Sequence, residues 1–409
     1  MTRLRRRLLA PYHYAWALFS AFWYGFPARR LVVIGVTGTK GKSSVAEMLY
    51  AIFTAAGHRT ALAGTIRFAV GEESRPNLFK MTLPGRGFIQ KFLAEALTKK
   101  CTHVVIEITS EATLQYRHLY LNLDGLIVTN IRPEHIESHG SFKKYVEAKR
   151  SIVDALVRSP KHSKILVANS DIAETREFLS APVSRTIGFS ANELKNISGD
   201  ERSMRFEYKE TPFSLPLPGV FNAMNALSAI KLGEALGIPL STASRALAAL
   251  TPIRGRVEHV DAGQDFLVVV DYAHTPDSLR ALYDAFPHHR KICVLGNTGG
   301  GRDKGKRPLM GAIADELCEK VILTNEDPYD EDPRGIVEMM ARDMKRAPEI
   351  IMDRRSAIRS AIRSARPGDA VLISGKGTDP YIMGPRGSKE PWSDAVVVRE
   401  ELERLLAEI

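Results

Sequence analysis

Cysteine is scarce in this sequence: Cys101, Cys293 and Cys318 stand far apart among 409 residues and form no Cys-x-x-Cys pair. That spacing supports neither a disulfide framework nor a cysteine-based zinc site. Cys293 lies in the apolar run of residues 291–295, so we expect a buried structural thiol at this position. A protein with few and separated cysteines fits a reducing cytoplasm.

The sequence also lacks internal repeats, low-complexity tracts and long linkers. Its N-terminal apolar run, residues 8–26, contains Pro11 and His13 and is short of the ~20 residues that a spanning helix needs. No small-residue cleavage site of a signal peptide is evident. Two interpretations of residues 1–30 stay open. They form an interfacial aromatic helix with a basic collar, in weak contact with a membrane surface, or a helix packed on the protein body.

The composition indicates a globular protein, because 44% of the residues are hydrophobic and the length allows two or three domains. Lysine and arginine outnumber aspartate and glutamate by 57 to 47. The excess is spread along the chain, apart from the cluster Arg3, Arg5, Arg6 and Arg7. This distribution favours an enzyme that handles anionic substrates such as nucleotides over a nucleic-acid-binding protein.

Short apolar runs alternate with helical stretches, which predicts an α/β fold with a mostly parallel sheet. The expected strands are residues 31–35, 103–107, 125–129, 164–168, 266–270, 291–295, 320–323 and 370–374. Residues 183–216 instead suggest short antiparallel strands. We expect three parts: the N-terminal segment 1–30, a P-loop central domain at 31–254, and a smaller Rossmann-like α/β C-terminal domain at 255–409.

A glycine-rich segment, Gly35-Val-Thr-Gly-Thr-Lys-Gly-Lys-Ser43, joins the first strand to a helix over 44–56. In such a loop the backbone N–H groups converge on phosphate oxygens, a lysine neutralises the β- and γ-phosphates, and a serine hydroxyl ligates Mg²⁺. The generic motif places a glycine where this chain has Val36, and Gly38 supplies the flexibility instead. The loop indicates ATP or GTP binding without naming the reaction.

Three further polar residues stand near the carboxyl ends of predicted strands, where ligand sites of α/β folds form. Glu107 closes one strand, His135 follows another, and Lys149 comes 14 residues later. Taken singly, each has a plain interpretation as a capping, loop or solvent-facing side chain.

The whole chain from about residue 31 resembles the Mur ligases, and among them the MurE branch. The shared segments occur in order: Thr37-Gly-Thr-Lys-Gly-Lys-Ser-Ser44, Glu107-Ile-Thr-Ser110, Thr129-Asn130, Glu134-His135, Glu147-Ala-Lys149, Phe221-Asn-Ala-Met-Asn-Ala226, Gly255-Arg-Val-Glu258, Asp271-Tyr-Ala-His-Thr-Pro-Asp277, Gly299-Gly-Gly-Arg-Asp-Lys-Gly-Lys-Arg-Pro308, Thr324-Asn-Glu-Asp-Pro328 and Gly375-Lys-Gly377.

The resemblance implies an ATP-dependent amide-bond ligase with ATP and Mg²⁺ as cofactors. It implies that the matching lysine, Lys149, is carbamylated by CO₂ and becomes an oxygen ligand for the metal, and that Lys42, Glu107, His135 and Lys149 form the catalytic set. The implied metal ligands are Ser43, Glu107, His135 and Lys149. The implied nucleotide contacts are Thr37, Gly38, Thr39, Lys40, Gly41, Lys42, Ser43, Ser44, Asn222, Arg256, Asp271 and His274.

For the acid substrate, the resemblance implies a muramoyl peptide linked to UDP. Only about 34 residues precede the phosphate loop here, so we expect the UDP-binding domain of these ligases to be missing, shortened or replaced. The implied contacts to the acid and to the acceptor amino acid are Thr82, Thr109, Ser110, Arg117, Arg302, Asp327, Tyr329, Gly375 and Asp379.

The segment Asp327-Pro328-Tyr329 lacks the arginine of the diaminopimelate-type pattern. Because Asp327 and Asp379 are acidic, we expect them to suit a distal ammonium, and so lysine over diaminopimelate. The reaction implied is phosphorylation of a carboxylate to an acyl-phosphate, followed by attack of an amine. A folylpolyglutamate synthase is the alternative ligase, and a non-catalytic protein on a ligase scaffold is the alternative class. We expect a cytoplasmic monomer without a nucleic-acid partner.

Overall fold

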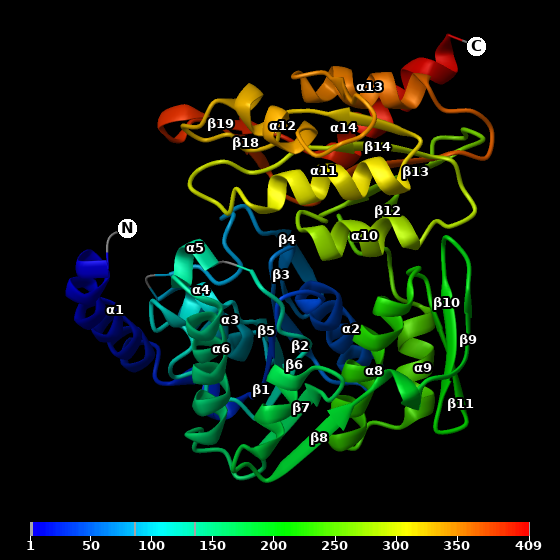
Figure 1. Cartoon of the computed structure of the whole chain (residues 1–409). Helices are drawn as coiled ribbons and strands as arrows, with labels where there is room; N and C mark the ends of the chain where they lie inside the picture. The colour runs from blue at the N-terminus through cyan, green and yellow to red at the C-terminus, as the bar shows by residue number, and fades with distance from the viewer. Residues whose placement is uncertain (1–2, 86, 135, 409) are drawn as a thin grey trace. The chain divides into compact units, whose positions relative to one another are not determined.

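The computed structural model describes residues 3–85, 87–134 and 136–408, and the chain divides into two compact units (Figure 1). The first unit comprises Met1–Ser198, Met204–Pro216 and Phe221–Leu250. The second comprises Gly199–Ser203, Leu217–Val220 and Thr251–Ile409.

The first unit is built on an eight-stranded sheet of order β4-β3-β2-β5-β1-β6-β7-β8. All of its neighbouring strands run parallel except β2–β3 and β3–β4, which are antiparallel. Its strands are β1 (Val32–Thr37), β2 (Thr60–Ala63), β3 (Arg67–Val70), β4 (Glu73–Pro76), β5 (His103–Glu107), β6 (Gly125–Val128), β7 (Ile165–Asn169) and β8 (Arg185–Phe189). The predicted mostly parallel α/β sheet is confirmed.

Strands β1, β5, β6 and β7 are buried on both sides because helices cover both faces of this sheet. The core on one face joins strand residues to α3 and α6, and Leu232 of α8 approaches Gly125 from the other. The helices of this unit are α1 (Arg3–Trp23), α2 (Lys42–Ala55), α3 (Phe88–Thr98), α4 (Ser110–Thr113), α5 (Ile136–His139), α6 (Phe142–Val157), α7 (Ala173–Arg176), α8 (Val220–Ala235), α9 (Leu240–Ala248) and the 3₁₀ turns η1 (Pro27–Arg30), η2 (Glu177–Ser180) and η3 (Ala191–Glu193).

The prediction of antiparallel strands over 183–216 is partly wrong. Strand β8 pairs in parallel with β7 at the edge of the main sheet. An edge strand is exposed, so β8 lacks the continuous apolar run that marks a buried parallel strand. A separate sheet of order β11-β10-β9 follows, in which β10 and β11 are antiparallel. Its strands are β9 (Lys195–Gly199), β10 (Met204–Tyr208) and β11 (Thr211–Leu215).

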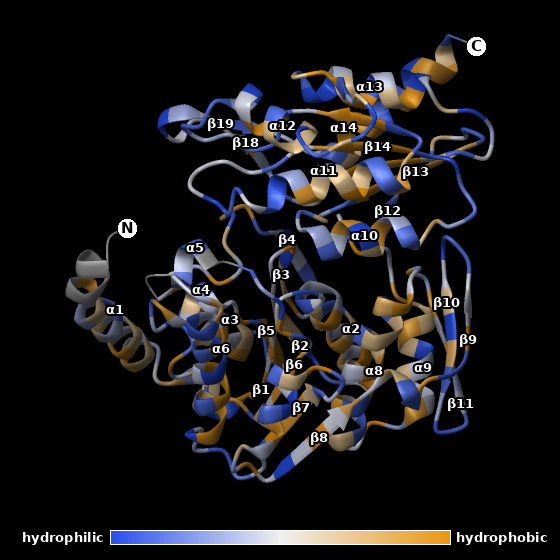
Figure 2. Cartoon of the chain, in the orientation of Figure 1, coloured by the Kyte–Doolittle hydropathy of each residue, from blue (hydrophilic) through white to orange (hydrophobic). Residues whose placement is uncertain are grey.

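The second unit contains a six-stranded sheet of order β12-β13-β17-β14-β15-β16, parallel except for β12–β13. Successive residues of β17 alternate between two cores: Leu372 packs with α10, α11 and α12, while Val371 and Ile373 pack with α13 and α14. Figure 2 shows the hydrophobic residues along β13 and β14. The elements are β12 (Glu258–His259), β13 (Leu267–Asp271), β14 (Lys291–Leu295), β15 (Lys320–Leu323), β16 (Glu349–Ile350), β17 (Ala370–Ser374), the pair β18 (Tyr381–Met383) and β19 (Lys389–Pro391), α10 (Pro276–Asp284), α11 (Lys306–Leu317), α12 (Pro333–Ala341), α13 (Arg354–Arg363), α14 (Asp394–Ala407) and η4 (Pro385–Gly387).

Cys293 and Cys318 form a disulfide, which corrects the expectation of a free buried thiol at Cys293. Cys293 lies on β14 and Cys318 directly follows α11, which packs against that strand in the same core. Packing of the helix on the sheet therefore joins two cysteines that are 25 positions apart in the sequence. The cysteines no longer support the argument for a reducing compartment.

The N-terminal segment forms helix α1, whose residues Ser20 and Ala21 are buried. Helix α1 approaches α3, and a β-carbon placed on Gly87 would lie 3.0 Å from the Cβ atom of Ser20. Within the described part of the chain, no helix combines the length and the apolar character that crossing a membrane requires.

Candidate functional site

The phosphate loop turns between β1 and α2 on two glycines with positive φ, Gly38 (144°) and Gly41 (80°). Both glycines are also needed for space. A β-carbon on Gly38 would lie 2.0 Å from the hydroxyl oxygen of Thr129, and one on Gly41 would lie 2.3 Å from Oδ1 of Asn225. A larger residue at Gly38 or Gly41 would therefore push the loop away from Thr129 or Asn225.

Thr129 and Asn130, directly after β6, fix the outer side of this loop. The backbone N–H of Thr39 donates to the carbonyl of Asn130 (2.8 Å), and that of Lys40 donates to Oδ1 of Asn130 (2.9 Å). The Thr129 hydroxyl donates to the carbonyl of Lys40 (2.6 Å). The loop is thus held in shape by the end of a neighbouring parallel strand, the edge where ligand sites of α/β folds form.

The Lys42 amine folds over the loop and donates to the carbonyls of Gly38 (3.0 Å) and Thr39 (2.8 Å). Ser43 and Ser44 follow it in the first turn of α2, and both are buried. A lysine in this position can turn its charge to a phosphate, and the first N–H groups of α2 can receive phosphate oxygens.

Glu107, at the end of β5, is buried and contacts Ser43. Strand β5 is the neighbour of β1, the strand that leads into the phosphate loop. The Ser43 hydroxyl donates to Oε2 of Glu107 (3.0 Å), and Thr65 donates its N–H to Oε1 (2.8 Å) and its hydroxyl to Oε2 (3.0 Å). Gly64 must be small here, because its β-carbon would lie 2.7 Å from Oε1 of Glu107.

Lys149, on α6, reaches the other side of the same loop and is only 1% exposed. Its amine donates to the Thr37 hydroxyl (3.0 Å) and to the Gly38 carbonyl (2.9 Å). Burial lowers the pKa of the Lys149 amine well below its usual range, and the nearby Lys42 cation lowers it further. The sequence made a solvent-facing lysine plausible at this position, whereas the structure buries the amine beside the phosphate loop.

The expected metal ligands are brought together in part. Ser43 and Glu107 touch, and Lys149 lies at the same loop, while His135 lies outside the described residues. Among the described residues, no three His, Cys, Asp or Glu side chains gather into a metal-binding group. A hydroxyl and a carboxylate are oxygen donors of the kind that Mg²⁺ prefers, so the donors present fit this cation.

Three of the expected nucleotide contacts lie together in the second unit, around the end of β13. Asp271 accepts from the N–H groups of Val257 (2.8 Å) and Ala273 (2.7 Å). The Arg256 guanidinium lies 4.7 Å from the centre of the Tyr272 ring, and the His274 ring packs against the same Tyr272 ring with 4.6 Å between the ring centres. Asn222, the fourth, is buried on α8 in the first unit.

The expected acid-binding residues of the first unit form two groups. The Thr82 hydroxyl shares a hydrogen bond with that of Thr65 (2.8 Å), which ties it to Glu107, and Arg117 donates to the carbonyl of Leu83 (2.7 Å) in the same loop. Thr109 caps α4, and Ser110 hydrogen-bonds the ring of His139 (3.1 Å). Thr82 thereby reaches the phosphate-loop side through a single intervening side chain.

The expected acceptor residues of the second unit gather around Lys376, which is fully buried. Its amine donates to Oδ1 of Asp327 (2.8 Å) and lies 3.7 Å from Oδ2 of Asp379. The N–H of Tyr329 donates to the carbonyl of Met383, the residue whose own N–H also donates to Asp327. Lys376 therefore offsets the acidic pair on which the expectation of a basic acceptor depended.

Two more acceptor positions belong to the same region. Gly375 has a φ of 106°, and its β-carbon would lie 2.2 Å from Oε2 of Glu326, so no larger residue fits. The Arg302 guanidinium lies close enough to Tyr272 and Tyr329 to favour ionisation of both phenols. It partly offsets the rise in pKa that the Asp379 carboxylate and burial cause at Tyr272, and that burial and the Asp327 carboxylate cause at Tyr329.

Sequence reasoning missed three residues that shape these clusters: Thr65, Asn225 and Lys376. Asn225 and Lys376 lie inside the quoted segments Phe221–Ala226 and Gly375–Gly377, so their positions were available although their contacts were not. Thr65 comes shortly after β2, whose sequence Thr60-Ala-Leu-Ala63 contains a single large apolar residue and so did not stand out as a strand.

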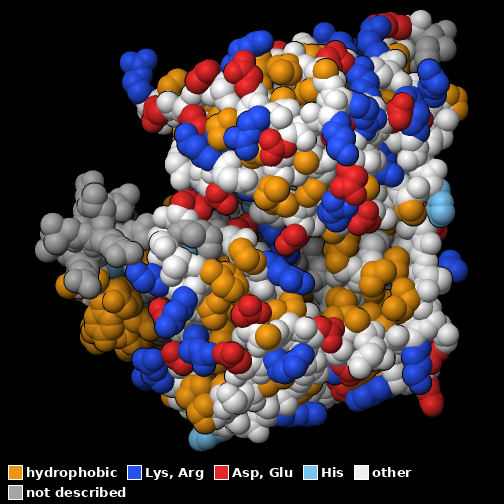
Figure 3. Space-filling model, in the orientation of Figure 1, with side chains coloured by type: hydrophobic (Ala, Val, Ile, Leu, Met, Phe, Trp, Pro, Cys, Tyr) orange, Lys and Arg blue, Asp and Glu red, His pale blue; other side chains and the backbone are white. Residues whose placement is uncertain are grey.

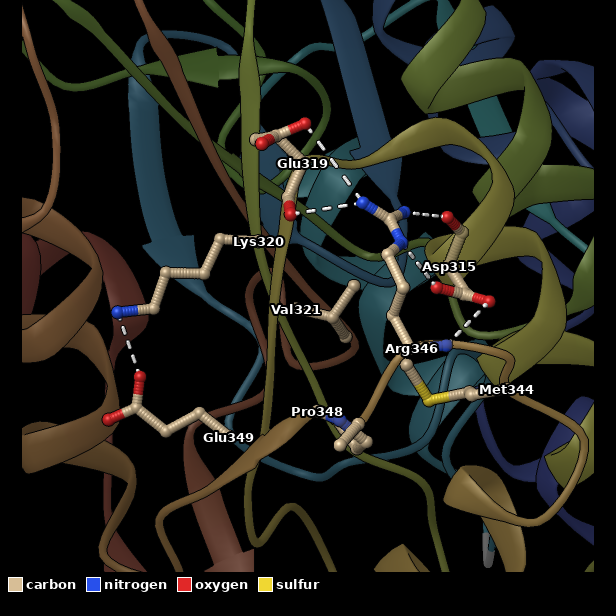
Figure 4. Close-up of a pocket in the computed structure, with 9 residues that line it drawn as sticks. Asp315, Glu319, Lys320, Val321, Met344, Arg346, Pro348 and Glu349 are labelled. Carbon is tan, nitrogen blue, oxygen red and sulfur yellow. Dashed lines mark hydrogen bonds and ion pairs between the residues drawn. The ribbon is translucent and has the colours of Figure 1, made fainter.

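A surface pocket in the second unit includes neither the residues at the end of β13 nor those around Lys376 (Figure 4). Its charged side chains pair with one another: Arg346 with Asp315 (2.9 Å) and Lys320 with Glu349 (2.8 Å). Such pairing is typical of a structural ion-pair network.

Two family descriptions match the chain. Residues 36–233 match the Mur ligase middle domain, and residues 255–377 match the Mur ligase, glutamate ligase domain.

Two relatives match nearly the full chain. The UDP-N-acetylmuramoyl-L-alanyl-D-glutamate--2,6-diaminopimelate ligase of Caldanaerobacter subterraneus subsp. tengcongensis is 33% identical over 402 residues, which cover 95% of this chain and 81% of the relative. The UDP-N-acetylmuramyl-tripeptide synthetase of Roseiflexus sp. is 35% identical over 421 residues, covering 96% and 82%.

Solved structures show the same fold. A UDP-N-acetylmuramoyl-L-alanyl-D-glutamate--2,6-diaminopimelate ligase superposes with a TM-score of 0.62 at 27% identity, over 92% of this chain and 79% of its own. A folylpolyglutamate synthase of Mycobacterium tuberculosis superposes with a TM-score of 0.72 over 89% and 93%, but at 18% identity, where the likeness shows the fold alone.

Proposed function

Because the chain belongs to the Mur ligase family, we propose that it is a cytoplasmic, ATP-dependent ligase that joins an amino acid to a carboxylate of a nucleotide-linked muramoyl peptide. The observation that carries the proposal is the convergence of Lys42, Glu107 and Lys149 on one glycine-lined loop. The same proposal makes residues 255–409 the acceptor-binding domain.

Two steps give the amide. A carboxylate oxygen of the acid attacks the γ-phosphorus of ATP, so that ADP leaves and an acyl-phosphate forms. The neutral amine of the acceptor then attacks the acyl carbon, and inorganic phosphate leaves as the new C–N bond forms. The first step makes a poor electrophile reactive, because phosphate is a far better leaving group than oxide.

The protein's contribution to these steps is positioning and charge. The N–H groups at the start of α2 and the Lys42 amine receive the phosphate oxygens and offset the charge that develops during transfer. Thr82, hydrogen-bonded to the Thr65 that holds Glu107, and Arg117 in the neighbouring loop are placed to orient the acid.

Mg²⁺ would be held by Ser43, Glu107, His135 and a modified Lys149, and it would supply additional positive charge to the phosphate oxygens. We propose that Lys149 is carbamylated, because its amine is buried beside Thr37 and Gly38 and close to Lys42. Adding CO₂ releases a proton and turns the amine into a carbamate, whose negative charge suits a site that already contains a lysine cation.

The acceptor is proposed as an amino acid whose α-carboxylate meets Arg302. Lys376 offsets Asp327, so the charges around the distal end no longer separate lysine from diaminopimelate. We therefore retain both as candidate acceptors.

The test is ATP-dependent release of inorganic phosphate from the purified protein with UDP-muramoyl-dipeptide and a panel of lysine, ornithine and diaminopimelate. The proposal predicts release only when acid and acceptor are both present, with the amide product visible by mass spectrometry. Absence of product with every acceptor contradicts it.

The fold likeness to folylpolyglutamate synthase keeps one alternative in the assay. The muramoyl-peptide ligases agree with this chain at 33–35% identity, well above the 18% of that synthase. Phosphate release with folate and glutamate, and none with the muramoyl peptide, would favour the alternative.

A further inference from the structure

Helix α1 exposes a continuous row of aromatic side chains. Tyr12, Trp16, Phe19 and Trp23 are spaced by four, three and four residues, which puts them on one helical face. Their rings follow one another at centroid distances of 6.4, 5.7 and 5.8 Å. The exposed fractions are 47% at Tyr12, 37% at Trp16, 53% at Phe19 and 70% at Trp23.

More apolar residues flank this aromatic row. Phe22 is 71% exposed and Leu18 is 42% exposed. Figure 3 shows the resulting group of hydrophobic side chains over α1, at the left of the view. Large exposed apolar groups that adjoin one another, unlike single ones, indicate an interaction surface.

The opposite face of α1 is fixed to the first unit, so the aromatic row is turned away from the core. Ser20 and Ala21 are buried, and Ser20 faces the Gly87 backbone at the start of α3. Tyr14 packs edge-on against the Tyr116 ring (5.9 Å) and accepts a hydrogen bond from the Tyr120 hydroxyl. These contacts position the row without covering it.

The charged residues of the N-terminal segment that contains the row have one sign. No acidic residue precedes Glu47 in this sequence, whereas Arg3, Arg5, Arg6 and Arg7 fall in the first turns of α1. Residues 8–28 contain no Asp, Glu, Lys or Arg, and the exposed Arg29 and Arg30 follow them. An uncharged aromatic stretch between basic ends complements an anionic, amphiphilic surface.

We propose that α1 binds the surface of an anionic phospholipid bilayer through the row Tyr12, Trp16, Phe19 and Trp23. Tryptophan and tyrosine are the side chains that concentrate at the headgroup level of membranes, because their rings are apolar and their edges donate hydrogen bonds. Arginines beside such a helix add attraction to anionic headgroups. The helix does not cross the bilayer, in line with the absence of a spanning helix among the described residues.

Flotation of the full-length protein with vesicles tests this proposal. Vesicles of equal parts phosphatidylglycerol and phosphatidylcholine should carry the protein upward, and pure phosphatidylcholine vesicles should carry much less. The variant W16S/F19S/W23S should lose vesicle binding by at least about tenfold. The variant R3Q/R5Q/R6Q/R7Q should lose binding by a similar factor, and its remaining binding should depend less on salt.

The matched control is L309S/V396S, which removes two apolar side chains that are 55% and 53% exposed on α11 and α14. It should float like the unaltered protein. Circular dichroism melts of each variant check that the fold is retained.

Fluorescence gives a second readout that does not depend on flotation. Trp16, Trp23 and Trp392 are the three tryptophans of the chain, so W392F leaves only those of α1. Its emission should shift to shorter wavelength when phosphatidylglycerol vesicles are added.

Equal flotation of the aromatic triple variant and the unaltered protein would overturn the proposal. The proposal would also be overturned if the unaltered protein did not bind vesicles and sedimented as a dimer while the triple variant sedimented as a monomer, because the row would then face a second copy. Both readouts measure binding without substrate, so their outcome is separate from that of the ligase assay.

Discussion

The Lys149 amine on α6 lies 3.0 Å from the hydroxyl of Thr37, the last residue of β1, although the two residues are 112 positions apart. The same amine donates to the Gly38 carbonyl, so a buried cation-forming group contacts the first turn of the phosphate loop. A lysine in such a place is costly to keep charged, and this cost makes its chemical state central to the site.

Replacing Lys149 by Ala should lower kcat by at least about 10²-fold while the protein still folds, because the site loses an oxygen ligand and its geometry. Short carboxylic acids such as acetate should restore part of the activity of K149A, since they can supply the missing carboxylate oxygen. Phosphate release with and without acetate measures both effects. K231A removes another buried lysine, which bonds the Gly188 carbonyl away from the loop, and should keep its activity.

Carbamylation also predicts a dependence on CO₂ and pH. The neutral amine reacts with CO₂, and burial lowers the pKa of Lys149, so the neutral form exists well below the usual lysine range. Activity should therefore fall in CO₂-depleted buffer and on acidification, which protonates the amine, and added bicarbonate should restore it at the higher pH. A protein equally active after CO₂ removal, with an unmodified Lys149 by intact mass spectrometry, contradicts the carbamate.

Gly41→Ala should weaken ATP binding by about tenfold or more. Its φ of 80° strains an alanine, and the added β-carbon would lie 2.3 Å from Oδ1 of Asn225. Gly57→Ala is the matched control, because Gly57 has nearly the same φ, 85°, and nothing lies within 4 Å of its β-carbon position. Isothermal titration with ATP should separate the two; equal weakening would mean that backbone strain, and not the contact with Asn225, decides.

Most of the parallel strands could be predicted because their residues are buried on both faces of the sheet, so that each of these strands appears in the sequence as a short apolar run. Strands β5, β14, β15 and β17 begin and end at the predicted residues. Strands β2, β3 and β4 were missed because none of them contains a run of large apolar residues, and β4 is exposed throughout. Strand β8 was misassigned because its edge position leaves it exposed.

The part of the site that one continuous segment forms could be predicted from the sequence, whereas the contacts between distant segments could not. The phosphate loop is one continuous segment, so its residues are recognisable as a motif in the sequence. The contacts of Lys149 with Thr37, of Asn225 with Gly41 and of Lys376 with Asp327 join distant segments, and only the folded chain brings them together. The disulfide was missed for the same reason: the packing of α11 on β14, rather than the cysteine spacing, brings its two ends within reach.

Lys376→Met should destabilise the second unit by about 3–5 kcal/mol, because the Asp327 carboxylate would remain buried without its cation. The double variant K376M/D327N should recover most of that loss, since neither charge then remains. Urea unfolding of the single and double variants measures the coupling. If the single variant unfolds at the wild-type urea concentration, Lys376 does not offset Asp327, and the preference for a basic acceptor regains its argument.

Reduction of the Cys293–Cys318 disulfide should lower the stability of the second unit. The bond closes a loop of 25 residues, and loss of such a closure costs roughly 3 kcal/mol in the chain-entropy description. For a unit of this size the melting temperature should fall by roughly 6–12 °C when a reductant is added. C293S/C318S should melt at the lower temperature with or without reductant. C101S, which alters the buried free cysteine of the first unit, should respond to reductant as the unaltered protein does. An unaltered protein that melts at one temperature in both conditions would show that the two sulfurs are not joined in solution, and the expectation of a buried free thiol at Cys293 would stand again.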